Sequence, residues 1–265
     1  VGAQRVLTLK RACAVICALG LHLVAPTASA QQQAPEDVER SIRTPNRLTA
    51  GASNEFMGSL SPSEDRLYFV SDSGATLDLV VQNPVESEPQ PASDGFGDVA
   101  WPETSPDGKR ISYVSFERDA TGDACVRNIR SKKETCVTDS KTAELQVLWW
   151  DNESLAVLSR NALHGDFSLS RIDVESGSRS KLVTANMVGI TLSPDRKWLA
   201  YIPLERRRAG VGVTFSNRAS KSVMLRSLPN TSGASITYKP PLPGVTGFLA
   251  FSADGNYLYF AQYLN

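Results

Sequence analysis

Short stretches in which apolar and polar residues alternate recur along most of the chain, and each follows a turn signal. The clearest covers residues 105–115, where Ser-Pro-Asp-Gly precedes a run in which Ile111 and Tyr113 alternate with Arg110 and Ser112. Proline presets φ at the second position of a type I turn, aspartate suits the third position, and glycine suits the fourth. Alternation with a period of two is typical of a half-buried β-strand. This stretch therefore predicts a tight turn that leads into a strand.

The same turn-and-strand phrase returns at a regular interval. Three further copies cover residues 61–70, 193–202 and 252–260, and a degenerate copy covers residues 150–158. Equivalent positions are 62, 106, 150, 194 and 253, so the spacing is 44 residues three times and then 59. A period in the low forties with several short strands per unit indicates a β-propeller. No window of eleven or more residues after the N-terminal region shows helical periodicity, so we predict an all-β fold.

Each repeat divides into four short strands, which predicts four-stranded antiparallel blades. Four full blades are expected at about residues 54–92, 98–138, 144–184 and 187–238, with a partial fifth at 245–265. Residues 44–49 have the pattern of an outer strand that would complete the last blade, so the propeller region is assigned to residues 44–265. Four and a half blades would leave sheet edges exposed. We therefore expect this chain to be the N-terminal part of a larger propeller, with the remainder following residue 265.

The turn-and-strand phrase resembles the WD40-like repeat of the TolB family. The copies that begin at Ser105, Ser193 and Ser252 match that repeat best, and the resemblance covers about residues 43–265. It implies a non-enzymatic binding or scaffold propeller that engages proteins or other cell-envelope components through its loop faces and central channel. Propellers host many unrelated activities. One alternative is the substrate-gating propeller of a prolyl-oligopeptidase-like serine peptidase, whose catalytic domain would lie beyond residue 265. Another is a sensor propeller fused to a transmembrane partner.

The first thirty residues have the three parts of a secretory signal peptide. Basic residues precede an apolar run at 12–24, and an Ala-Ser-Ala cleavage site ends at Ala30. The apolar run is too short for a typical spanning helix, although an uncleaved anchor is the alternative. Residues 31–43 are polar and aperiodic, which predicts a flexible leader. We therefore expect cleavage after Ala30, export to the periplasm or the medium, and no stable membrane insertion.

Charge and cysteine content fit an exported protein. The chain has 28 basic and 28 acidic residues, and removal of the signal peptide leaves a net charge of −3. This balance favours neither nucleic acid nor an anionic membrane as a partner. Cys125 and Cys136 are expected on the two outer strands of the second blade, where they could face each other. In an oxidising compartment a disulfide is the favoured state. The alternatives are a redox-active pair, which this spacing disfavours, and two unpaired thiols on opposite strand faces.

The sequence contains no recognisable catalytic, cofactor or metal motif. His164 is the one histidine outside the signal peptide, and neither a Gly-x-Ser-x-Gly elbow nor a phosphate-binding glycine loop occurs. Acidic residues at the turns, such as Asp107 and Asp195, are expected to stabilise turns rather than to bind calcium. Trp149 and Trp150 are expected to belong to the core. We therefore predict no enzymatic activity, no metal site and no cofactor within these residues.

One segment departs from the repeat. The long final spacing reflects an insertion at about residues 204–218, which contains Arg206, Arg207, Arg208 and Phe215. Three adjacent arginines on a neutral protein could recognise an acidic partner, with Phe215 as an apolar contact. The alternative is a solvated hairpin extension, because long loops cost little stability. The insertion is thus the candidate partner-binding loop.

Overall fold

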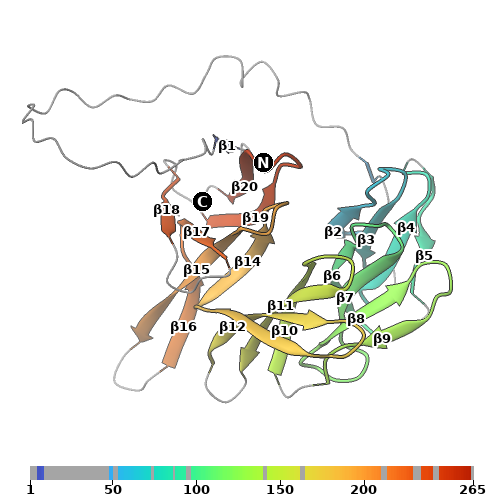
Figure 1. Cartoon of the computed structure of the whole chain (residues 1–265), viewed down its shortest axis with the longest axis horizontal. Coiled ribbons are helices and arrows are strands. Elements are labelled where there is room, and N and C mark those ends of the chain that lie inside the picture. The colour runs from blue at the N-terminus through green and yellow to red at the C-terminus, as the bar shows by residue number, and fades with distance from the viewer. Residues whose placement is uncertain are drawn as a thin grey trace, which may run out of the picture.

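β-Strands grouped into antiparallel sheets make up the regular secondary structure of the described residues (Figure 1). The computed structural model describes residues 5–8, 48–49, 53–72, 75–85, 87–93, 97–139, 142–161, 165–209, 214–228, 234–240 and 245–263. Within these ranges no α-helix occurs, so none is long and apolar enough to cross a membrane. The prediction of an all-β fold is confirmed for this part of the chain.

Four sheets are four-stranded blades, and a fifth sheet is partial. Blade 1 contains β2 (Glu55–Leu60), β3 (Leu67–Ser71), β4 (Asp78–Gln82) and β5 (Gln90–Pro91). Blade 2 contains β6 (Val99–Thr104), β7 (Arg110–Ser115), β8 (Asp123–Asn128) and β9 (Glu134–Cys136). Blade 3 contains β10 (Thr142–Trp149), β11 (Ser154–Asn161), β12 (Phe167–Asp173) and β13 (Arg179–Thr184). Blade 4 contains β14 (Met187–Leu192), β15 (Trp198–Ala209), β17 (Val223–Ser227) and β18 (Ser235–Tyr238), and β16 (Thr214–Ala219) pairs with the far end of β15. The partial sheet contains β19 (Val245–Phe251) and β20 (Tyr257–Tyr263).

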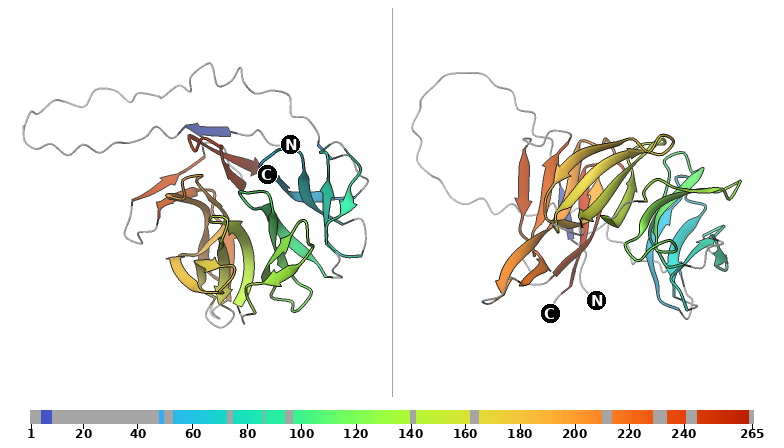
Figure 2. Two further views of the ribbon diagram at one scale, coloured as in Figure 1. Left: turned by 45° about the vertical axis from the view of Figure 1, so that its right-hand side comes forward. Right: turned by 90° about the horizontal axis from the view of Figure 1, so that it is seen from below.

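The blades follow one another around a common centre, from blue-green through yellow to red in Figure 1 and again in the turned views of Figure 2. The first strand of each blade is the inner one, and the inner strands of consecutive blades touch. This is the propeller arrangement that the 44-residue period predicts.

The second strand of each blade is more deeply buried than its alternating sequence indicates. We expected a half-buried strand at β7, but Ser112 is completely buried, as are Ile111 and Tyr113 on either side of it. The reason is that blade 2 packs between blades 1 and 3, so both of its faces contribute to cores between blades. Tyr68 and Val70 of blade 1, for example, belong to the same apolar cluster as Tyr113 of blade 2. The Ser112 hydroxyl is satisfied inside the sheet, where it donates to the Glu103 carbonyl at 3.3 Å.

The repeated turn is held by bonds within six residues. The Ser105 hydroxyl accepts from the Arg110 N–H at 3.0 Å and donates to Asp107 Oδ1 at 2.7 Å, while the Gly108 N–H donates to the Ser105 carbonyl. Gly108 has a φ of 68°, in the left-handed region that glycine enters without penalty. The equivalent residue of blade 4 is Arg196, which adopts a φ of 58° without being glycine. The turn geometry therefore survives the loss of the glycine.

The partial sheet has a third strand from the start of the chain. β1 (Arg5–Thr8) pairs antiparallel with β20, in the register Arg5↔Phe260 to Thr8↔Tyr257. These four residues lie within the predicted signal peptide, which stays a prediction. Of the outer strand expected at residues 44–49, the structure describes only Leu48 and Thr49, which form no strand and line a cavity with Phe56 of blade 1.

Candidate functional site

All five inner strands depart from regular pairing near their middle, where the register of each against its neighbour shifts. Four of these irregularities contain a residue with positive φ: Met57 (57°), Trp101 (55°), Gly189 (58°) and Phe248 (48°). A left-handed conformation costs a residue with a large side chain roughly 1 kcal/mol or more. β-Bulges redirect side chains and are common beside functional sites. The propeller therefore repeats one backbone feature around its centre, and the feature is costly at Met57, Trp101 and Phe248.

The bulges surround a central cavity of about 480 Å³. Its lining is mostly apolar and includes residues from all four blades and the partial sheet: Met57, Trp101, Glu103, Gln146, Gly189, Phe248 and Tyr259. The side chains of Phe248 and Tyr259 are 58% and 38% exposed, respectively, although both are aromatic. Among the described lining residues, Glu103 is the one that carries a charge. The central cavity thus offers accessible aromatic surface beside a single carboxyl group.

Polar side chains at the centre connect neighbouring blades. Gln146 of blade 3 accepts from the Ile190 N–H and donates to the Ile190 carbonyl, each at 2.9 Å, which fastens β10 to β14. The Thr104 N–H of blade 2 donates to the Ser59 hydroxyl of blade 1 at 3.1 Å. Each bond satisfies a backbone group of an inner strand. These contacts hold the cavity wall in a fixed shape.

Glu103 lies at a junction of three blades. Its Oε2 accepts from the Trp149 N–H at 2.5 Å, and its carbonyl accepts from the Trp149 indole at 2.8 Å. Burial raises the pKa of Glu103 to about 7, against the opposing effects of the Trp149 N–H and the charge of Arg196. Glu103 therefore changes its charge near neutral pH, in the wall of the central cavity.

The acidic turn residues have structural partners, as expected. Hydrogen bonds from Ser105 and the Lys109 backbone lower the pKa of Asp107, and Asp195 has the same pattern with Ser193 and Lys197. Consecutive turns also touch one another. Arg196 Nε donates to the Trp150 carbonyl at 2.7 Å. These aspartates therefore stabilise the face of the propeller that carries the turns.

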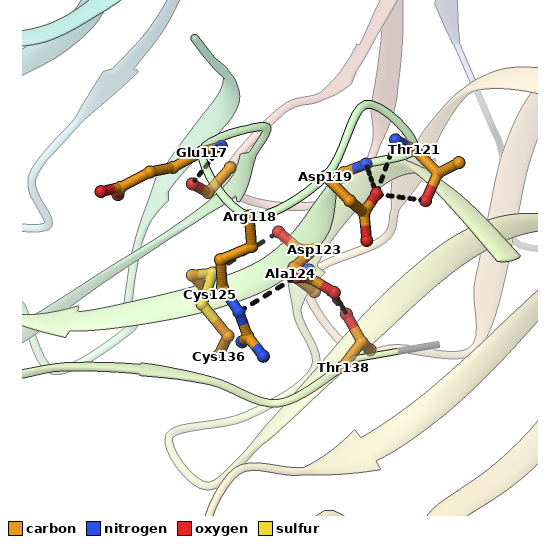
Figure 3. Close-up of polar contacts among 11 residues, drawn as sticks. Glu117, Arg118, Asp119, Thr121, Asp123, Ala124, Cys125, Cys136 and Thr138 are labelled. Atoms are coloured by element: carbon orange, nitrogen blue, oxygen red, sulfur yellow. Dashed lines mark hydrogen bonds and ion pairs between the residues drawn. A yellow bond between two sulfur atoms is a disulfide. The ribbon is translucent and has the colours of Figure 1, made fainter. Parts of the chain in front are cut away.

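Cys125 and Cys136 lie opposite each other on β8 and β9 and form a disulfide with an S–S distance of 2.00 Å (Figure 3). Beside it, burial raises the pKa of Asp123, while Arg118, at 3.6 Å, opposes that effect. The Ala124 N–H donates to the Thr138 hydroxyl at 2.8 Å. In the described part of the chain, one group of three potential metal ligands occurs, formed by the two cysteines and Glu134. The disulfide removes both thiolates, so this group is not a metal site.

The candidate partner-binding loop is a β-hairpin rather than an irregular loop. The second strand of blade 4, expected to end near Pro203, continues to Ala209 and pairs with β16 in the register Arg206↔Asn217, Arg207↔Ser216 and Arg208↔Phe215. In Figure 1 the hairpin projects from blade 4 away from the other blades. The backbone of Phe215 lies directly opposite that of Arg208.

The remaining candidates do not form a site. Trp149 is 1% exposed and belongs to the core between blades 2 and 3, as expected. Trp150 is partly buried and stacks with the Arg171 guanidinium at 5.7 Å. His164 lies outside the described residues.

The residues with positive φ around the central cavity are regularly spaced in the sequence, although the turn motifs do not identify them. Met57 and Trp101 are 44 residues apart, Gly189 follows after two more periods, and Phe248 follows after the longer interval of 59. The bulge positions therefore share the period of the turns. Their residue types differ, however, so a comparison of motifs does not reveal them.

Comparison with known proteins supports the fold. No family model and no curated protein matches the chain. TolB from Acinetobacter baumannii matches with a TM-score of 0.56 and 14% identity, over 82% of this chain and 56% of that chain. A putative TolB from Agrobacterium tumefaciens matches with a TM-score of 0.51 and 14% identity, over 82% and 93% of the respective chains. An oligogalacturonate lyase from Vibrio parahaemolyticus matches with a TM-score of 0.52 and 13% identity, over 80% and 73%. At these identities the likeness shows the fold alone: this chain has a β-propeller fold that resembles those of TolB and of at least one enzyme.

Proposed function

We propose that this protein is an exported, non-enzymatic binding propeller of the TolB kind, which receives a segment of a partner protein of the cell envelope in its central cavity. The observation that supports the proposal is the arrangement of the bulges, which present Met57, Trp101 and Phe248 to one apolar cavity at the centre. Exposed aromatic side chains in a concave, pre-formed site are typical binding anchors. The polar groups of the wall, Gln146 and Glu103, are bonded to neighbouring blades, so their evident role is to fix its shape.

Photo-crosslinking tests this function directly. A photoreactive phenylalanine analogue replaces Phe248 in one full-length protein and Ile236 in a matched control, because Ile236 is 47% exposed but lies on the outer strand β18. We expect a discrete crosslinked envelope protein from position 248 and none from position 236. Adding Trp101→Asn should abolish the crosslink, since asparagine tolerates the left-handed backbone but removes the indole. Equal crosslinking from both positions would contradict the proposal.

The hairpin formed by β15 and β16, which contains Arg206, Arg207 and Arg208, is proposed as a second contact with the same partner. Replacement of Arg206, Arg207 and Arg208 by serine should weaken the crosslink at position 248 without a change in melting temperature. An unchanged crosslink would leave the hairpin as a solvated extension.

A further inference from the structure

Two adjoining cavities at the boundary of blades 1 and 2 are lined by basic side chains. They measure about 720 and 460 Å³ and share Arg66, Ile129 and Arg130. We call them together the basic groove, defined by Arg66, Lys109, Arg127, Arg130 and Lys132. No aspartate or glutamate occurs among the described residues that line either cavity. The charged side chains that line the two cavities are therefore all basic, although carboxylates lie near some of them.

A neighbouring carboxylate compensates Arg66 of the groove only weakly. Arg66 Nε lies 3.9 Å from Asp65 Oδ2, and this buried nitrogen has no hydrogen-bond partner among the described residues. This distance exceeds the range of a charge-assisted hydrogen bond. Arg127 is buried and already has partners, among them Glu134 Oε2 at 3.8 Å, so it belongs to the wall of the groove rather than to the cations available to a ligand.

The remaining cations are more exposed. Lys109 Nζ lies 3.5 Å from Asp107 Oδ2, but the lysine side chain is 77% exposed. Arg130 and Lys132 occupy the turn between β8 and β9 and form no ion pair with a described residue. The basic groove therefore retains capacity for an anionic ligand.

The floor of the groove is apolar. Val81 and Ile129, which are partly exposed, line the second cavity together with the almost fully buried Tyr68 and Ile111, and Asn83 supplies an amide. A ligand that satisfies the whole groove must therefore combine carboxylates with apolar groups. A small inorganic anion or a sulfated polysaccharide would leave the floor uncovered.

We propose that the basic groove binds an acidic peptide segment of a partner protein, with carboxylates on the cations and an apolar side chain on the floor. The site is distinct from the central cavity, because no described residue lines both. Guanidinium groups bind carboxylates in a two-pronged geometry that favours acidic peptides over neutral ones. The proposal does not depend on what occupies the central cavity.

Fluorescence anisotropy with the full chain tests the proposal. The probe is a labelled peptide of alternating glutamate and leucine, and the two comparison peptides replace glutamate by glutamine or leucine by glycine. The groove variant carries Arg130→Asn and Lys132→Asn, since asparagine tolerates the φ of 58° at Lys132. The matched control carries Lys181→Asn and Lys239→Asn, two exposed cations of blades 3 and 4.

We expect the acidic peptide to bind, and the groove variant to bind it about tenfold or more weakly, because two charge-assisted contacts are lost. The control variant should bind within about twofold of the wild type, which is the loss expected from screened distant charges. No binding at low salt, equal binding of the glutamine peptide, or equal losses in both variants would overturn the proposal. Equal binding of the glycine peptide, or of a heparin fragment with the same loss in the groove variant, would also overturn it, because the groove would then be a site for simple anions.

Discussion

Glu103→Gln should make the stability of this protein less dependent on pH. Glutamine keeps an oxygen that can accept from the Trp149 N–H, so the bond between blades 2 and 3 is retained. It removes the only group in the described wall of the central cavity that ionises near neutrality. The variant therefore isolates the titration of one partly buried carboxyl from the packing around it.

The size of the effect follows from the two pKa values of Glu103. The ordinary pKa is 4.5, and burial raises it to about 7 in the folded protein. Between these values the unfolded chain releases a proton that the folded chain keeps, so stability falls as the pH rises. The contribution is fully present below pH 4.5 and is lost as the pH rises through about 7. One pKa unit corresponds to about 1.4 kcal/mol, so the total loss is about 3 kcal/mol.

Urea unfolding followed by tryptophan fluorescence measures this difference. The free energy of unfolding of the wild type and of Glu103→Gln is determined at several pH values between 4.5 and 8.5, and the wild-type value is subtracted. Other titrating groups cancel in the subtraction. We expect the stability of the variant relative to the wild type to increase by about 3 kcal/mol across this range, which is about 6–12 °C in melting temperature. A relative stability that stays constant with pH would refute the assignment of a raised pKa to Glu103.

Three other perturbations test parts of the fold. Non-reducing peptide mapping should recover Cys125 joined to Cys136, and replacing both by serine should lower the free energy of unfolding by about 2–3 kcal/mol, as for other short disulfide loops; free thiols at both positions would contradict this. Gly122→Ala should destabilise the fold severely, because the φ of Gly122 is 80° and an added Cβ would lie 2.7 Å from a valine side chain. Gly177→Ala is the control: Gly177 has a φ of 68° but open space around it, so the substitution should lower the free energy of unfolding by only about 1 kcal/mol. Equal melting temperatures of the two variants would show that the close contact does not matter. Ser105→Ala should cost about 1–2 kcal/mol through the loss of two turn hydrogen bonds, and an unchanged urea midpoint would exclude that role of the hydroxyl.

The repeated turn could be predicted from the sequence because its interactions are local. The hydroxyl of Ser105, the carboxylate of Asp107 and the N–H of Arg110 meet within six residues, so residue order alone brings them together. The same argument explains why four blades and a partial fifth follow from the spacing of the turns. The local origin of the pattern also explains why the predicted half-burial of β7 was wrong. Alternating polar and apolar residues reflect neighbours in the sequence only, whereas Ser112 is buried because sheets pack on both sides of it.

The candidate binding features depended on tertiary structure. Burial raises the pKa of Glu103, and the cavity beside it is lined in part by residues more than forty positions away in the sequence, such as Met57 and Gln146. The basic groove joins Arg66 to Arg130 across the boundary of two blades. Arg206 to Arg208 are easily noticed in the sequence because they are adjacent, whereas the basic groove is formed by cations that are scattered along the chain. The electrostatic environment and the burial of a side chain depend on distances in space, which the order of residues does not give. The sequence by itself therefore determined the repeat, its turns and its strands, and only the packing of the blades decided which side chains share a cavity.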